Sequence, residues 1–180
     1  MNRKEFPLPV TVIIPVRNRP ELLLQALDSV CGTAWPSEVL VVSNGTAEDR
    51  KADREAFERW KSRLPRIKKA EDLPDSQLRS RFLERAEPGP AGARNLGARQ
   101  ASQPWLAFLD SDDVWKPEKL ERQWNFLAAR PHLKACHSRE DWQKGPRRLS
   151  VPLRLQPVTG APLEQSLHVC LVSASSIMIQ

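Results

Sequence analysis

Residues 105–113 (WLAFLDSDD) run from five consecutive apolar side chains directly into three carboxylates within four positions. An uninterrupted apolar run predicts a strand buried on both faces, which is typical of α/β sheets covered by helices. Asp110, Asp112 and Asp113 would then lie at the carboxyl end of that strand. Open α/β folds bind their ligands at this edge of the sheet.

The three carboxylates allow two interpretations. Crowded acids repel one another unless a cation lies among them, and hard oxygen ligands suit Mg²⁺ or Mn²⁺. Asp110 and Asp112 could supply the one or two carboxylates that such an ion takes beside substrate phosphates and water. The alternative is an acidic turn that caps the next helix, with Asp113 ahead of the helix and Pro117 in its first turn.

Composition predicts one globular domain over residues 1–180, because 40% of the residues are hydrophobic and 28% are charged. No stretch approaches the roughly 20 apolar residues that span a bilayer, and residues 1–5 lack the apolar core of a signal peptide. We therefore expect a cytoplasmic protein. The three cysteines are widely spaced, which predicts neither a disulfide framework nor a zinc site.

The net charge of +6 and the pI near 9.6 would by themselves admit nucleic acid or an anionic membrane as partners. Residues 50–69 hold nine basic and three acidic residues, which equals the whole excess. A helix expected over about 48–64 places most of these bases opposite its apolar stripe, so a solvated face is the default interpretation. Peripheral contact with the inner face of a membrane through residues 50–69 stays open.

Two further loops are expected at the same sheet edge. A β-branched run over residues 9–15 predicts a buried first strand, and a helix over 21–31 and a strand over 38–42 complete a βαβ unit. The loops after the two strands cover residues 16–19 and 43–46. Residues 89–98 then open a helix of small side chains, which lets it lie close to a sheet and approach a ligand with backbone N–H groups.

The second half of the chain carries weaker signals. We expect a short strand over 78–83, a helix over 117–130, and at most one strand between 132 and 162, near 133–137. A helix over about 163–169 and a strand over 172–180 close the chain. Because no turn or cap follows that strand, we expect the chain to stop short of its natural end.

Taken together, these motifs resemble family 2 glycosyltransferases with the GT-A fold. The resemblance rests on residues 12–20 (VIIPVRNRP), 93–97 (ARNLG), 108–113 (FLDSDD) and 117–120 (PEKL). It implies a Rossmann-like α/β fold with a mostly parallel central sheet flanked by helices. No GxGxxG or GxxxxGK[ST] motif occurs, so a dinucleotide or P-loop site is not expected.

The resemblance implies transfer of a sugar, with inversion, from a nucleotide-diphosphate sugar to an acceptor hydroxyl on a glycan, lipid or protein. The ion would be Mn²⁺ or Mg²⁺ on Asp112, with Asp110 assisting or contacting the ribose. The implied nucleotide-sugar contacts are Pro15, Val16, Arg17, Asn18, Asn44, Arg94, Asp110 and Ser111. Arg94 could equally pack against the sheet edge.

Two positions depart from the family pattern. Ser43 and Asn44 stand where two aspartates are usual after the second strand, and Arg17 replaces a common aromatic residue. An asparagine amide both accepts and donates hydrogen bonds, and a planar guanidinium can stack on a base. The general base would follow Gln180, so no catalytic residue is assigned, and Glu140 and Asp141 are the first substitutes to test.

Two other functions compete with this hypothesis. A basic nucleic-acid-binding module would leave the three acids unexplained, and the chain lacks interleaved aromatic residues or a reader motif, so no nucleic-acid partner is expected. A metal-dependent nucleotidyltransferase would need a Gly-rich basic loop after the first strand. Residues 16–19 contain no glycine.

Overall fold

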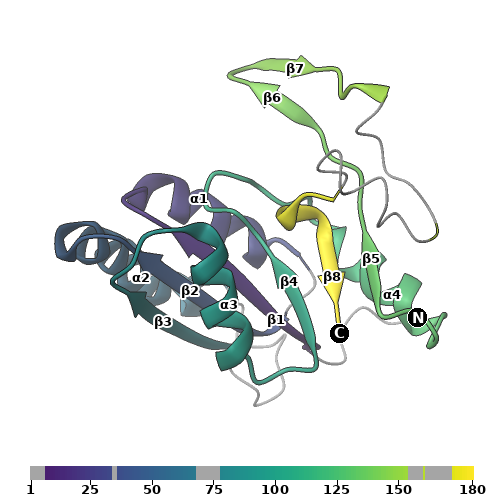
Figure 1. The fold of residues 1–180 in the computed structure, drawn as a ribbon, viewed down its shortest axis with the longest axis horizontal. Coiled ribbons are helices and arrows are strands. Elements are labelled where there is room, and N and C mark those ends of the chain that lie inside the picture. The colour runs from purple at the N-terminus through teal and green to yellow at the C-terminus, as the bar shows by residue number, and fades with distance from the viewer. Residues whose placement is uncertain (1–6, 34–35, 68–77, 154–159, 161–171) are drawn as a thin grey trace.

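The computed structural model describes residues 7–33, 36–67, 78–153, 160 and 172–180 of the chain. Six strands form one sheet in the order β3-β2-β1-β4-β8-β5 (Figure 1). The first four are parallel to one another: β1 (Leu8–Val16), β2 (Pro36–Asn44), β3 (Arg79–Arg85) and β4 (Trp105–Phe108). This confirms the predicted α/β fold with a mostly parallel sheet.

The remaining two strands run antiparallel at one side of the sheet. β8 (Ile177–Ile179) pairs with β4, and β5 (Ala135–His137) pairs with β8. The strand predicted over 172–180 is shorter than expected, because a 3-10 turn, η3 (Ala174–Ser176), occupies the residues before it. The helix predicted over 163–169 lies outside the described residues.

Helices cover the two faces of the sheet unequally. The larger core lies between the sheet and α1 (Pro20–Cys31), α2 (Ala47–Ile67) and α4 (Lys119–Ala128), and it includes Val12, Leu27 and Trp60. The opposite face carries α3 (Pro90–Gln100), which packs over β1 and β2 (Figure 1). Its core is smaller and centres on Ile13, Leu40, Val42 and Ala93.

Because the two faces are covered unequally, the prediction that the 105–109 strand is buried on both faces is wrong. Ala107 and Leu109 are fully buried, but Leu106 and Phe108 are half-buried against the smaller core. The reason is that α3 lies over β1 and β2 and leaves the α3 side of β4 partly open.

Two local features differ from what the sequence indicated. The helix expected over 117–130 is present as Lys119–Ala128, with Glu118 at its N-cap and no side-chain cap, so the alternative in which Asp113 caps it is wrong. A hairpin of β6 (Trp142–Lys144) and β7 (Arg147–Leu149), missed in the sequence, stands apart from the main sheet (Figure 1). Its turn contains Gly145 at φ 58°, a left-handed conformation that glycine adopts readily.

Among the described residues, no helix combines the length and the apolar character that crossing a bilayer requires.

Candidate functional site

A pocket of about 630 Å³ opens at the carboxyl ends of β1, β2 and β4. The three loops expected at this edge do meet there, together with the start of α3. The pocket is lined by Pro15, Val16, Arg17, Arg19, Asn44, Pro88, Gly89, Pro90, Arg94, Asp110, Ser111 and Asp112. Of the predicted site residues, Asn18 is the one that does not line it.

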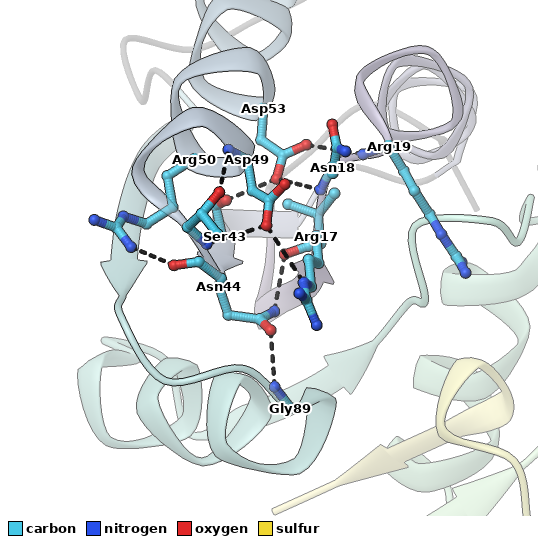
Figure 2. Close-up of polar contacts among 12 residues, drawn as sticks. Arg17, Asn18, Arg19, Ser43, Asn44, Asp49, Arg50, Asp53 and Gly89 are labelled. Carbon is cyan, nitrogen blue, oxygen red and sulfur yellow. Dashed lines mark hydrogen bonds and ion pairs between the residues drawn. The ribbon is translucent and has the colours of Figure 1, made fainter.

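Asn18 instead shapes the loop after β1. It is the one non-glycine residue with positive φ in the described chain, at 50°, a conformation that asparagine tolerates better than most residues. Its backbone N–H donates to Asp53 Oδ2 at 3.1 Å, and the next N–H, of Arg19, donates to Asp53 Oδ1 at 3.1 Å (Figure 2). Asp53, on α2, is completely buried and also accepts from Ser43 Oγ at 2.7 Å.

Asn44 connects two walls of the pocket. Its Nδ2 donates to the Val16 carbonyl at 2.8 Å, and its Oδ1 accepts from the Gly89 N–H at 2.9 Å (Figure 2). The side chain thus joins the end of β1 to the residue that precedes α3. The first N–H group offered by the glycine-rich segment is therefore bound to the protein.

The aspartates of the acidic motif face arginines from other elements. Arg19 forms an ion pair with Asp112, and Arg94 on α3 forms one with Asp110. Arg19 and Asp112 are each about half exposed, at 50% and 49%, whereas Arg94 and Asp110 are more enclosed, at 24% and 34%. Opposite charges at this spacing make the pocket suited to a ligand that carries both anionic and metal-binding groups.

Ser175 supports the acidic turn from the far end of the chain. Its hydroxyl accepts the Asp110 N–H at 2.9 Å, and its carbonyl accepts Trp115 Nε1 at 2.9 Å. Desolvation raises the pKa of Asp113. A hydrogen bond with Ser175 lowers that pKa, but the negative charges of Asp110, Asp112 and Glu140 raise it further.

The acidic motif fits a partial shell for a divalent ion. The structure contains no group of three or more His, Cys, Asp or Glu side chains, within its described part, that could hold a metal. Asp110 and Asp112 both line the pocket, however, and an ion of the magnesium type needs only one or two protein carboxylates when phosphates and water complete its shell. Asp112 is half exposed, so exchanging Arg19 for an ion requires only a side-chain movement.

Glu140 and Asp141 lie on the segment that leads into β6. Hydrogen bonds and charges from Lys116 and Arg148 lower the pKa of Asp141, which makes it a weak base. Glu140 accepts from Trp142 Nε1 at 3.1 Å. Neither residue lines the pocket.

Sequence reasoning missed Arg19, Asp53 and Ser175. Arg19 had a signal, since it repeats the charge of Arg17 two positions away in a predicted site loop. Asp53 also had one, because it falls on the stripe of α2 that buries Phe57 and Trp60. Ser175 had none, because its contacts depend on where the chain's last described segment docks.

Comparison with known proteins places this chain in a family. The model described as "Glycosyl transferase family 2" matches residues 11–171. This chain belongs to glycosyl transferase family 2. A Rickettsia bellii protein described as an uncharacterized glycosyltransferase is 35% identical over 119 residues, which are 66% of this chain and 15% of that family member.

Solved structures share the fold. Residues 1–349 of S. aureus TarS align with a TM-score of 0.66 at 20% identity, covering 94% of this chain and 46% of that one. The complex of the same fragment with UDP aligns with a TM-score of 0.55 at 22% identity, covering 70% and 33%. The mannosyltransferase PcManGT from Pyrobaculum calidifontis, in complex with GDP-Man and Mn²⁺, aligns with a TM-score of 0.57 at 26% identity, covering 72% and 35%. The chain thus spans less than half the length of the curated relative and of each of these solved chains.

Proposed function

We propose that this chain forms the nucleotide-sugar-binding part of an enzyme that transfers a sugar, with inversion, from a nucleotide-diphosphate sugar to an acceptor hydroxyl. The observation that carries the proposal is the pocket, where Arg17, Arg19 and Arg94 meet Asp110 and Asp112 at the carboxyl ends of three parallel strands. TarS with UDP and PcManGT with GDP-Man support a donor of this class.

The pocket's own residues suggest how the donor lies. Guanidinium groups bind phosphate oxygens in pairs of hydrogen bonds, so Arg17 and Arg19 are placed to hold the diphosphate. Pro15, Val16 and Asn44 form the wall for the nucleoside, with Asn44 beside the base. Arg94, held by Asp110, orients that carboxylate and lies close enough to reach base or phosphate.

A divalent ion belongs to this proposal as a cofactor, and Asp112 with Asp110 would hold it. When bound, Mn²⁺ or Mg²⁺ would stabilise the negative charge that develops on the departing nucleoside diphosphate. The Mn²⁺ in the PcManGT complex supports this choice of cofactor.

The acceptor and the cellular location also belong to the proposal. We propose a glycan, lipid or protein hydroxyl as acceptor and a cytoplasmic location. Ion pairs reduce the positive charge with which residues 50–69 could bind a membrane. Arg54 pairs with Glu84, Arg59 with Glu21 and Arg63 with Asp28. The same pairs reduce the charge available to nucleic acid.

Calorimetry with UDP and with GDP, each in Mn²⁺ and in EDTA, tests the proposal. We expect one nucleotide to bind and its affinity to fall when the ion is removed. Equal affinity in Mn²⁺ and EDTA would exclude the role of the metal. No binding of either nucleotide would contradict the donor site itself.

A further inference from the structure

The carboxyl group of Asp53 is buried beneath the pocket and faces the loop that carries two of its arginines. None of its surface is exposed, and it accepts hydrogen bonds from the backbone N–H groups of Asn18 and Arg19 and from the hydroxyl of Ser43 (Figure 2). All three donors are neutral. Burying a carboxylate is unfavourable unless hydrogen bonds satisfy it, so this group ties α2 firmly to the loop.

The loop that Asp53 holds has a conformation that needs such support. Asn18 adopts a positive φ, and Arg19 is the N-cap of α1 without any side-chain cap. Two successive N–H groups therefore point to one acidic side chain at the amino end of a helix, where the helix dipole favours negative charge. Asp53 thereby supplies to α1 the anionic partner that its own sequence lacks.

A second acid of α2, Asp49, holds the Arg17 side chain of the same loop. Asp49 Oδ2 accepts the Thr46 N–H at 3.0 Å and lies 3.4 Å from Arg17 Nε. The Thr46 hydrogen bond and the Arg17 charge lower the pKa of Asp49. Gly45 leaves the space for this contact, because a Cβ there would lie 2.5 Å from Asp49 Oδ2 and 3.0 Å from Arg17 Nε.

We propose that Asp53 is a positioning residue of the donor site, which holds the loop of residues 17–19 so that Arg17 and Arg19 face the diphosphate of the nucleotide. The inference rests on the proposed donor function. Asp53 does not line the pocket, so its effect on binding passes through the arginines. A loop already ordered in its bound conformation loses less freedom when the ligand arrives, and affinity is higher for that reason.

The test is a double-mutant cycle measured by calorimetry with UDP and GDP in Mn²⁺. Asp53→Asn should lower nucleotide affinity by about tenfold or more, since two arginines lose their fixed positions. In the Arg17→Ala/Arg19→Ala background the same substitution should change affinity by no more than about twofold, the ordinary deviation from additivity. Equal losses in the two backgrounds would show a general structural effect and overturn the proposal.

Glu38→Gln is the matched control. Glu38 is another buried acid of the same sheet, 1% exposed, but it accepts hydrogen bonds from Thr11 and Ser102 at the opposite end of β2. It should lower stability and leave nucleotide affinity within about twofold of the parent. If Glu38→Gln weakens UDP or GDP binding as much as Asp53→Asn does, the positioning role is wrong.

Two further outcomes separate this inference from the proposed function. A parent protein that binds neither nucleotide overturns the donor site and the role of Asp53 with it. A parent that binds while Asp53→Asn binds equally well overturns the role of Asp53 alone. If Asp53→Asn does not fold, amide hydrogen exchange of the parent decides, because the Asn18 and Arg19 amides must then be protected and gain protection with UDP or GDP.

Discussion

Asn44 shows how one side chain can join two loops of a binding site. It is 3% exposed, and its amide satisfies a carbonyl at the end of β1 and an N–H before α3. The sequence predicted a contact with the nucleotide base at this position, which stays a prediction. The structure adds a second role, because the amide also holds the pocket's walls together.

We expect Asn44→Ala to lower the free energy of unfolding by about 1 to 3 kcal/mol, since two buried backbone groups lose their partners. Urea denaturation measures this loss. Nucleotide affinity should fall as well, by about tenfold or more, because the predicted contact with the base is lost. Asn44→Asp is the control, because it keeps the acceptor for Gly89 and loses the donor to Val16. An unchanged dissociation constant in Asn44→Ala would move the base elsewhere.

Asp112 is the residue on which we expect the metal dependence of nucleotide binding to rest. We expect Asp112→Asn to abolish the part of UDP or GDP affinity that Mn²⁺ adds, because an amide replaces a charged ligand of a dication. Calorimetry of the variant in Mn²⁺ and in EDTA measures that difference. Asp113→Asn, next in the chain and outside the pocket lining, serves as the comparison. A variant that keeps the full Mn²⁺ effect would assign the ion to other groups.

At the scale of the elements, α3 is the one whose packing sets the shape of the pocket. Gly97 is buried against β1 and β2, and a Cβ there would lie 2.5 Å from Ile13 Cγ2. The small residues predicted to bring this helix close to the sheet therefore do so. Pro90 and Arg94, in the amino half of the same helix, and Gly89, directly before it, line the pocket.

We expect Gly97→Ala to destabilise the protein by about 1 to 3 kcal/mol, because the added methyl group overpacks a core in which Ile13 has little room to move. Urea denaturation gives the change. Gly92→Ala is the matched control in the same helix, since the atoms nearest to its Cβ would belong to the flexible end of Arg85 and not to the sheet core. Alanine has the higher helix propensity at both positions, so an equal loss in both variants would mean that contact with the sheet does not decide the cost.

At the scale of the whole molecule, some buried charges are paired with a charge on another element, whereas others, such as Asp53 and Lys119, are buried apart from any described ion pair. Glu38 illustrates the first kind: burial alone would raise its pKa, but hydrogen bonds from Ser102, Thr11 and Arg81 outweigh that effect and lower it. Lys119 illustrates the second, because desolvation lowers its pKa to about 7. Its Nζ donates to Gln123 Oε1 at 2.6 Å and lies 4.0 Å from the centre of the Trp115 ring.

The Lys119 shift predicts that the protein becomes more stable as pH rises above about 7. Between that value and about 10.4 the unfolded chain binds a proton that the folded chain has released, so the free energy of unfolding increases with pH. We expect a gain of about 1 to 3 kcal/mol from pH 7 to 9, after allowing for the opposing attraction of the Trp115 ring. Urea denaturation at several pH values measures it.

Lys119→Met is the control, since it keeps the length and apolar stem of the side chain without a titrating group. The difference in stability between the parent and this variant should change with pH over the same window. Parallel pH profiles would show that Lys119 does not titrate in the folded protein near pH 7.

The sequence by itself determined the parallel strands of the sheet and the sheet edge at which the site lies. The apolar runs before Pro15, Ser43 and Asp110 define strands by local pattern alone, and parallel strands place their carboxyl ends together. Asn44, Arg94 and Asp112 could therefore be assigned to one pocket without coordinates. The same reasoning overestimated the burial of Leu106 and Phe108, because burial depends on which strands a helix covers.

Only the tertiary structure decided how the loops are held. Asp53 reaches Asn18 across 35 positions, and Ser175 reaches Asp110 across 65 positions. Such contacts arise from how helices and terminal segments pack on the sheet, and local periodicity carries no information about which loop a buried acid or hydroxyl will meet. The pairing of Arg19 with Asp112 is of the same kind, since two charges 93 positions apart meet only after β1 and β4 pair in register.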